Sequence, residues 1–206
     1  ISECLVGSEM CIRDRLISML TLLLGGTHAQ EQDNSLGLHL DFKGVTLDGT
    51  LSSFMKKLQE KGFIKEKDLG NDAAIMKGEF ANESVTLYIL ASQDSKTVWK
   101  VCAEFPKTAS WSSLKMKYFD FKELYTKKYG EPQSYEFFSK PYYEGDGYEQ
   151  LALSKEKCTY SSYFKTKEGY ISVEINKYSC IEISYEDAIN NELRKKEKEK
   201  NILNDI

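Results

Sequence analysis

The chain has 206 residues, with 28 lysines and arginines against 32 aspartates and glutamates, and its formal net charge is −4. This length suits one domain with a sizeable core. Beyond residue 15 the positive charge is nearly all lysine and Arg194 is the single arginine, so the clustered basic residues of nucleic-acid readers are missing and we expect neither DNA nor RNA as a partner.

The stretch from Arg15 to Ala29 has the three-part layout of a secretory signal. A basic residue leads an apolar run, Leu16 to Leu24, and two glycines and the small-x-small triplet Thr27 to Ala29 follow. The run is shorter than the roughly 20 apolar residues that a membrane span needs. We therefore expect residues 16–29 to be the signal core and cleavage region, and the finished protein to be periplasmic or secreted. An N-terminal buried helix is the weaker interpretation, because the glycines would break it.

Residues 1–15 have no helical or strand period and resemble translated sequencing-adapter read-through. A genuine polar leader is the alternative, and in either case the segment takes no part in the predicted fold. Residues 30–36 are typical of a polar linker. No cysteine stands at the expected cleavage point, and no second apolar run of membrane length follows. We therefore expect neither a lipid anchor nor a membrane span.

Residues 30–186 are expected to form one α+β domain with two halves, about 38–105 and 106–186, each a helix followed by an antiparallel meander. In the first half, a helix is predicted to begin after the N-cap Thr50 and to end before Gly62. Alternating apolar residues between turns predict the strands. The expected elements are a strand at 38–45, the helix at 51–61 and strands at 73–80, 84–91 and 97–105.

The second half is expected to repeat this order. Its helix is predicted in two pieces joined at Asp120, which has the capping-box offset to Glu123. Asp146 is expected to cap a short helix, and Asp187 a charged C-terminal helix over 187–206. The expected elements are helices at 111–129 and 148–153 and strands at 134–139, 159–165, 170–176 and 180–185. The apolar phases of the two halves do not align, so the duplication is expected in architecture and not as a sequence repeat.

Three segments carry a resemblance to known proteins: FKGVTLDGTLSSFMKKLQEKGF, WSSLKMKYFDFKELYTKKYGEP and CIEISYEDAINNELRKKEKEK. They resemble a group of small exported proteins of unknown function from Gram-negative anaerobes, over about residues 38–200. These segments mark capping and packing positions rather than an active site. The order of helices and meanders is also similar to the tandem α/β layout of beta-lactamase inhibitor proteins. That likeness concerns architecture alone and implies no inhibitory activity.

Residues with catalytic chemistry are scarce beyond the leader. His39 is the single histidine there, so a Ser-His-Asp or Cys-His arrangement has no choice of base, and an ordinary zinc site lacks its second histidine. His39 itself is expected to be solvated, on the polar side of the first strand. The glycines stand singly at turns, without a phosphate-binding motif. We expect no catalytic residue, no metal site and no cofactor.

Three cysteines follow the leader: Cys102, Cys158 and Cys180. If the chain turns about Gly169, Cys158 and Cys180 lie opposite each other at a spacing that suits a disulfide. An oxidising compartment favours that bridge. Two thiols are the alternative, because a shift of one residue in register removes the alignment. Cys102 is expected to be half-buried and inert, with a reactive thiol as the alternative.

Three carboxylates crowd one loop: Glu144, Asp146 and Glu149. A glycosidase-like acid pair or a calcium site is conceivable there, but the EF-hand spacing is missing. Acidic loop residues more often cap helices or face solvent, and we expect that role for these three.

The feature that we favour as functional is aromatic. Tyrosine is enriched where proteins bind one another, because it supplies a large, rigid and amphipathic contact area. A loop rich in proline and glycine is surrounded by Tyr135, Tyr142, Tyr143 and Tyr148. At least one ring of the adjacent pair Tyr142 and Tyr143 is expected to face solvent. Phe137 and Phe138 are expected to fill the core of the second half.

These observations predict an exported, non-catalytic protein that binds an unknown protein outside the cytosol, through the Tyr142 and Tyr143 loop and the neighbouring sheet face. The alternative is a periplasmic protein that binds a small ligand or glycan in a cleft between the halves, with Trp99 or Trp111 as a stacking platform. A hydrolase that uses Glu144 or Glu149 is the least favoured hypothesis.

Overall fold

The computed structural model describes residues 38–206, so the predicted signal and linker lie outside the described residues. The first half contains β1 (Asp41–Phe42), β2 (Val45–Thr46), α1 (Leu51–Glu60), β3 (Ile64–Asp68), β4 (Ala73–Phe80), β5 (Glu83–Ala91) and β6 (Val98–Glu104). The second half contains α2 (Trp111–Tyr129), β7 (Gln133–Phe138), α3 (Glu149–Ser154), β8 (Cys158–Lys165), β9 (Gly169–Ile175) and β10 (Ile181–Asp187), and α4 (Ala188–Asp205) follows.

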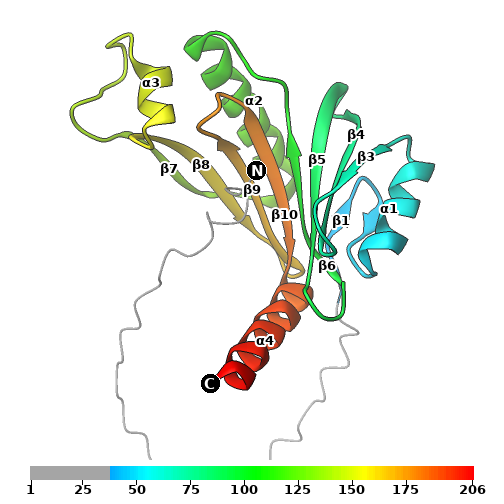
Figure 1. Cartoon of the computed structure of the whole chain (residues 1–206). Coiled ribbons are helices and arrows are strands. Elements are labelled where there is room, and N and C mark those ends of the chain that lie inside the picture. The colour runs from blue at the N-terminus through cyan, green and yellow to red at the C-terminus, as the bar shows by residue number, and fades with distance from the viewer. Residues whose placement is uncertain (1–37) are drawn as a thin grey trace, which may run out of the picture. The chain divides into compact units, whose positions relative to one another are not determined.

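One antiparallel sheet joins the two halves. Its strand order is β3-β4-β5-β6-β10-β9-β8-β7, so each half is a four-stranded meander and the last strands of the two meanders pair at the centre. Ala103 of β6 lies opposite Ile183 of β10. Figure 1 shows this arrangement, with α1 beside the first meander and α4 beyond one end of the sheet. The predicted α+β class, with two helix-plus-meander halves and a C-terminal helix, is confirmed.

The core lies on one face of this sheet. Side chains alternate between the faces of a strand, and Val85, Leu87 and Ile89 of β5 point to the core. Two helices cover that face, and their buried residues are Leu51, Phe54 and Leu58 of α1 and Leu114, Tyr118 and Phe121 of α2. Burial of one such side chain stabilises the fold by about 2 kcal/mol, so both helices are held mainly by this shared core.

The first helix follows the predicted caps. The Thr50 hydroxyl accepts a hydrogen bond from the Ser53 N–H at 3.4 Å, and the chain leaves the helix at Gly62, whose φ is 91°. The next residue, Phe63, packs its ring directly over Gly78 of β4. A Cβ atom at Gly78 would lie 2.3 Å from that ring, so any larger residue there would force the ring to move.

Three elements of the structure differ from the prediction. The strand expected at 38–45 is the short hairpin β1–β2, because the chain reverses at Lys43 and Gly44, both with positive φ. Strand β3 was not predicted, since all five of its residues are exposed and show no apolar alternation. Helix α2 is continuous through Asp120, and Ser110 caps it by accepting from the Ser113 N–H at 3.1 Å.

The predicted disulfide between Cys158 and Cys180 is wrong. Cys158 starts β8 and Cys180 precedes β10, and the whole of β9 lies between these two strands. The turn at Gly169 joins β8 to β9 alone. Both cysteines are buried thiols, and burial raises the pKa of Cys158 to about 12 and that of Cys180 to about 11.

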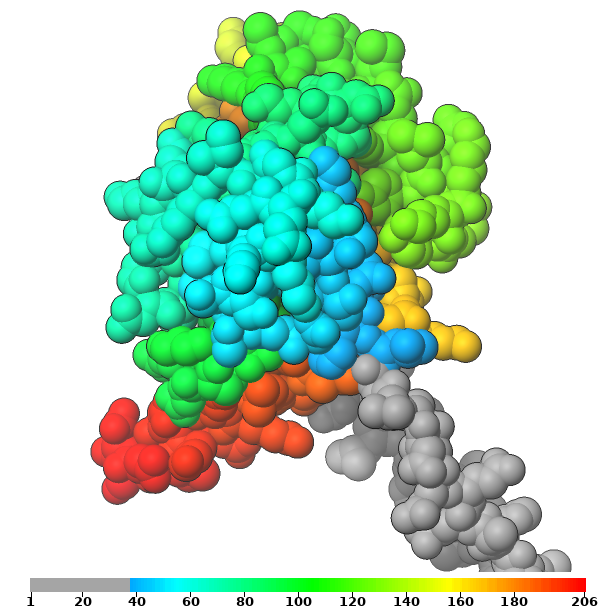
Figure 2. Space-filling view, turned by 90° about the vertical axis from the view of Figure 1, so that its right-hand side faces the viewer, coloured from blue at the N-terminus to red at the C-terminus, as the bar shows by residue number. Residues whose placement is uncertain are grey.

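Helix α4 begins directly after Asp187, the last residue of the central strand β10, and projects past the sheet (Figure 2). The Asp187 side chain caps it by accepting from the Asn190 N–H at 2.9 Å, as predicted. Farther along, the Glu197 carboxylate accepts from the Asp94 N–H at 3.0 Å and the Ser95 N–H at 3.2 Å, which fastens the helix to the turn between β5 and β6. Within residues 38–206, no helix is both long and apolar enough to cross a membrane.

Candidate functional site

The face of the sheet opposite to α1 and α2 is the candidate site, and we call it the open face. Strand pairing places one residue of each strand in a continuous row across it: Lys67, Ile75, Tyr88, Cys102, Ser184, Ser172, Tyr163 and Gln133. Helix α4 contacts β6, β9 and β10 at the end where β10 finishes. The open face is thus a broad surface formed by side chains of both halves.

Exposed aromatic side chains gather on strands β7, β8 and β9 of the second half. Four of them, which we call the aromatic group, are Tyr135, Phe137, Tyr163 and Tyr170. Tyr135 and Tyr163 are in edge-to-face contact, with ring centroids 6.1 Å apart. Exposed rings held in place by a sheet are the kind of surface that proteins bury against one another.

Phe137 was expected in the core, and that prediction is wrong. Its side chain is on the open face and is 50% exposed, whereas its neighbour Phe138 packs against the core as predicted. Consecutive strand residues point to opposite faces, so only one of the two rings could be buried.

The centre of the open face is small and polar. The Ser172 and Ser184 hydroxyls lie 2.8 Å apart in a hydrogen bond between β9 and β10, and Ser172 also donates to Glu174 at 2.7 Å. Both serines are buried, although they belong to the face away from the core. With Cys102 they form a run of small side chains between Tyr88 and Tyr163 in the row across the open face.

Three glutamates occupy paired positions on the central strands. Glu104 of β6 lies opposite Glu182 of β10, which lies opposite Glu174 of β9; we call them the acidic row. Glu104 accepts from the Asn176 amide at 2.9 Å and from the Tyr88 hydroxyl at 3.4 Å. Like charges at directly opposite positions repel, so these three side chains concentrate negative charge on the central strands of the open face. Burial, and then Glu174, raise the pKa of Tyr163 at the border of the row.

The structure does not bring the four predicted tyrosines together. Tyr135 is on the open face, whereas Tyr142 packs against the core on the helix side. Tyr143 and Tyr148 are exposed on the loop between β7 and α3, as expected for at least one of the adjacent pair. The remaining aromatic residues of the open face could have been found only from the register of β8 and β9.

The three loop carboxylates hold the loop together. Asp146 accepts from the Tyr143 N–H at 3.1 Å and from the Tyr148 N–H at 2.8 Å. Glu149 accepts from the Gly145 N–H at 3.0 Å, and Glu144 pairs with Lys115 of α2. Asp146 thus binds the residue before α3 rather than capping that helix directly. Within the described part of the chain, no three His, Cys, Asp or Glu side chains are grouped to hold a metal ion.

Both tryptophan side chains pack against other side chains of the protein. Trp99 is 6% exposed, and the Arg194 guanidinium of α4 lies over its ring, 4.2 Å from the centroid. Trp111 meets Phe138 and Tyr160 edge-on, with centroids 5.6 and 5.2 Å away. Its buried Nε1 has no hydrogen-bond partner among the described residues.

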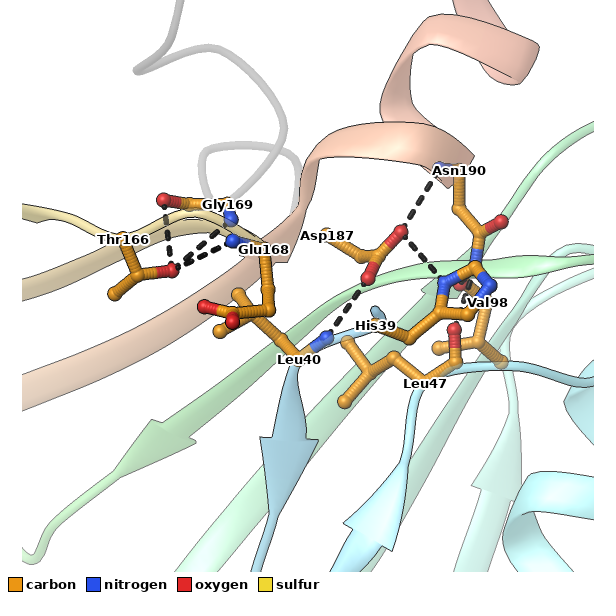
Figure 3. A network of polar contacts seen from close by, with 9 residues as sticks. All are labelled: His39, Leu40, Leu47, Val98, Thr166, Glu168, Gly169, Asp187 and Asn190. Carbon is orange, nitrogen blue, oxygen red and sulfur yellow. Dashed lines mark hydrogen bonds and ion pairs between the residues drawn. The ribbon is translucent and has the colours of Figure 1, made fainter. Parts of the chain in front are cut away.

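A buried polar network fastens the N-terminal hairpin to α4 (Figure 3). The fully buried Asp187 carboxylate meets His39 Nδ1 at 3.1 Å and accepts from the Leu40 N–H at 2.9 Å. The Asn190 amide donates to the carbonyl oxygens of Leu47 and Val98, at 2.5 and 2.8 Å. His39, expected to be solvated, therefore lies within a network, and its side chain is 23% exposed. Its partner Asp187 is distant in the sequence, so the local sequence pattern could not predict this contact.

Comparison of the chain with family models, with curated proteins and with solved structures finds no match. The resemblance to small exported proteins of Gram-negative anaerobes, and the likeness in layout to beta-lactamase inhibitor proteins, stay predictions.

Proposed function

We propose that this protein is an exported, non-catalytic module that binds another protein through the open face of its sheet. The observation that carries the proposal is the aromatic group, whose four exposed rings share one face with the acidic row. Rings fixed on a rigid sheet lose little conformational entropy when a partner covers them.

The charges of the open face suggest the chemistry of the target. The acidic row is flanked by hydroxyl groups and by the rings of Tyr88 and Tyr163, so a lysine or arginine of the target can sit over carboxylates and beside aromatic faces. Basic side chains at the centre of an apolar contact would supply both attraction at a distance and specificity.

A ligand or glycan site that uses Trp99 or Trp111 as a platform is supported less well. Arg194 covers the Trp99 ring, and Trp111 is engaged edge-on by two neighbouring rings. A hydrolase is also less favoured, since Glu144 is paired with Lys115 of α2 and Glu149 accepts a hydrogen bond within the loop. Titration of tryptophan fluorescence with sugars, bile acids and peptides tests the ligand hypothesis, and silence across all three would dismiss it.

The test of the proposal is a matched pair of double variants. Tyr163→Ala/Tyr170→Ala removes two rings of the open face, and Tyr143→Ala/Tyr148→Ala removes two exposed rings of the loop. A partner captured by the unsubstituted protein from an envelope extract of the native host is identified and purified, and its affinity for each variant is measured by calorimetry. We expect the open-face variant to bind at least about tenfold more weakly, because central aromatic residues each contribute more than about 1 kcal/mol. Equal affinity for that variant, or a loss confined to the loop variant, would overturn the open face as the binding surface.

A further inference from the structure

The sheet ends in two edge strands of opposite character. Strand β3 has the sequence IKEKD, with four charged residues, and its pairing with β4 shifts between Lys65 and Lys67. Strand β7 has the sequence QSYEFF, with Glu136 as its one charged residue, and it pairs with β8 over all six residues without a shift. Charges and a bulge prevent a further strand from adding to an edge, so β3 is protected and β7 is not.

The backbone groups on the outer side of β7 follow from its pairing with β8. The Ser139 N–H donates to the Lys157 carbonyl at 2.7 Å, one step beyond the pair Phe138 and Cys158. Hydrogen-bonded pairs alternate along an antiparallel ladder, so the odd-numbered residues of β7 bond to β8. The N–H and C=O groups of Ser134, Glu136 and Phe138 therefore point outward, where no described strand accepts them.

We propose that β7 pairs antiparallel with β7 of a second copy of this chain, about a two-fold axis at Glu136. In this register, Ser134 of each copy exchanges backbone hydrogen bonds with Phe138 of the other, and the two Glu136 residues exchange theirs. Tyr135 then lies opposite Phe137 in a non-hydrogen-bonded pair on the open face, where cross-strand side chains are closest. The pairing thus satisfies every outward backbone group of the strand.

A neighbouring register fits less well. A shift that places Tyr135 opposite its own counterpart brings Phe138 opposite Pro132, which has no N–H to donate. The opposite shift carries the pairing past Phe138, where β7 ends. The register about Glu136 is therefore the one in which the strand complements itself.

The charge at the axis is already compensated. Glu136 lies on the helix side of the sheet, where its carboxylate accepts from Lys122 at 2.6 Å and from the Tyr118 hydroxyl at 3.0 Å. Two such ion pairs meet at the axis in place of two bare carboxylates. Two-fold pairing also uses the one unprotected edge of each copy and leaves the two protected β3 strands at the ends, so assembly stops at a dimer.

Disulfide trapping tests this register on the full chain, with Cys4 and Cys11 replaced by serine. Purified Tyr135→Cys and Phe137→Cys proteins are oxidised separately and as a mixture, and Lys67→Cys on β3 is the control. We expect a covalent dimer in the mixture alone, since each introduced thiol lies opposite the other variant's thiol and not its own. A cross-link within a single variant, equal cross-linking of the control, or none in the mixture would overturn the pairing.

The mass in solution gives a second, independent measurement. We expect the unsubstituted chain to sediment as a dimer, and Phe137→Lys, which gives β7 the kind of charge that protects β3, to sediment as a monomer with an unchanged circular dichroism spectrum. A monomeric unsubstituted chain at every concentration up to its solubility limit would overturn the proposal. Failure here leaves target binding by Tyr163 and Tyr170 unaffected, because neither residue belongs to β7.

Discussion

The two halves of the molecule share one arrangement of helix and strands but differ in helix length and in the character of the edge strand. Each is a helix followed by four antiparallel strands, and they meet through β6 and β10. In the first half the helix has 10 residues and the edge strand is charged, whereas in the second the helix has 19 residues and the edge carries exposed rings. The short α3 is an addition of the second half alone. The comparison teaches that the same order of elements can end in a charged edge strand in one half and in an edge with exposed aromatic side chains in the other.

The largest expected effect tests whether the halves are one folding unit. Leu58 of α1 and Leu114 of α2 are fully buried in the same core, one in each half. Leu58→Ala and Leu114→Ala should each lower the free energy of unfolding by about 2–5 kcal/mol, through lost burial and the cavity left behind. Calorimetry should show one transition for each variant, moved to lower temperature. Two separate transitions in either variant would mean that the halves unfold independently.

Substitution of two glycines compares close packing against a side chain with close packing against the backbone. A Cβ atom at Gly169 of the second half would lie 2.1 Å from the Glu186 carbonyl oxygen, whereas one at Gly78 of the first half would meet the Phe63 ring. We expect Gly169→Ala to cost about 3 kcal/mol or more and Gly78→Ala about 1–3 kcal/mol, because a ring can shift and a paired backbone cannot. Urea denaturation measures both, and a smaller loss at Gly169 would contradict this ranking.

Alkaline pH should lower the stability of the protein through groups of the second half. Burial raises the pKa of seven described groups, and all of them lie there: Tyr118, Tyr125, Cys158, Tyr160, Tyr163, Cys180 and Tyr185. A group whose pKa is higher in the folded state than in the unfolded state contributes its full stabilisation at pH values below its unfolded-state pKa. It loses that contribution as the pH rises through its folded-state pKa. For Cys180 this window runs from 9.0 to about 11.

Urea midpoints measured at intervals from pH 8 to pH 11 should therefore fall, starting near pH 9. Cys180→Ala removes one titrating group and should make the decline between pH 9 and pH 11 shallower than in the unsubstituted chain. A midpoint that stays constant up to pH 11 would contradict the burial of these groups.

The smallest effect is expected at the junction of the hairpin and α4. His39→Ala removes one hydrogen bond to Asp187 at the partly exposed rim of the network and should cost about 1 kcal/mol. His39→Gln, which can still donate to the carboxylate, is the control and should recover much of the loss. Thermal unfolding compares the two, and an alanine variant as stable as the unsubstituted chain would show that the contact contributes nothing.

Local signals predicted most of the helices and strands. Thr50 and Asp187 cap their helices as expected, and the alternation of Ile171, Val173 and Ile175 marked a strand that the structure confirms. These features depend on residues within a few positions of one another. Strand β3 lacked such a signal, because a fully exposed edge strand need not alternate.

The site was predicted only in part, because it depends on which strands are neighbours. Tyr135 was proposed for binding, but its partner in the structure, Tyr163, is set by the pairing of β7 with β8. The acidic row joins residues 104, 174 and 182 through the central strands, and no local pattern relates them. The same cause explains the failed disulfide, since β9 separates two cysteines that a single hairpin would have placed together.

The central position of β10 has a consequence for biosynthesis. Among the described strands it is the last in the sequence, yet it is the one that closes the sheet against β6. Until it is synthesised, the nascent first meander exposes β6 as an open edge, and the pairing of the two halves must wait for residues 181–187. We expect the nascent chain to need protection from self-association until β10 has paired with β6.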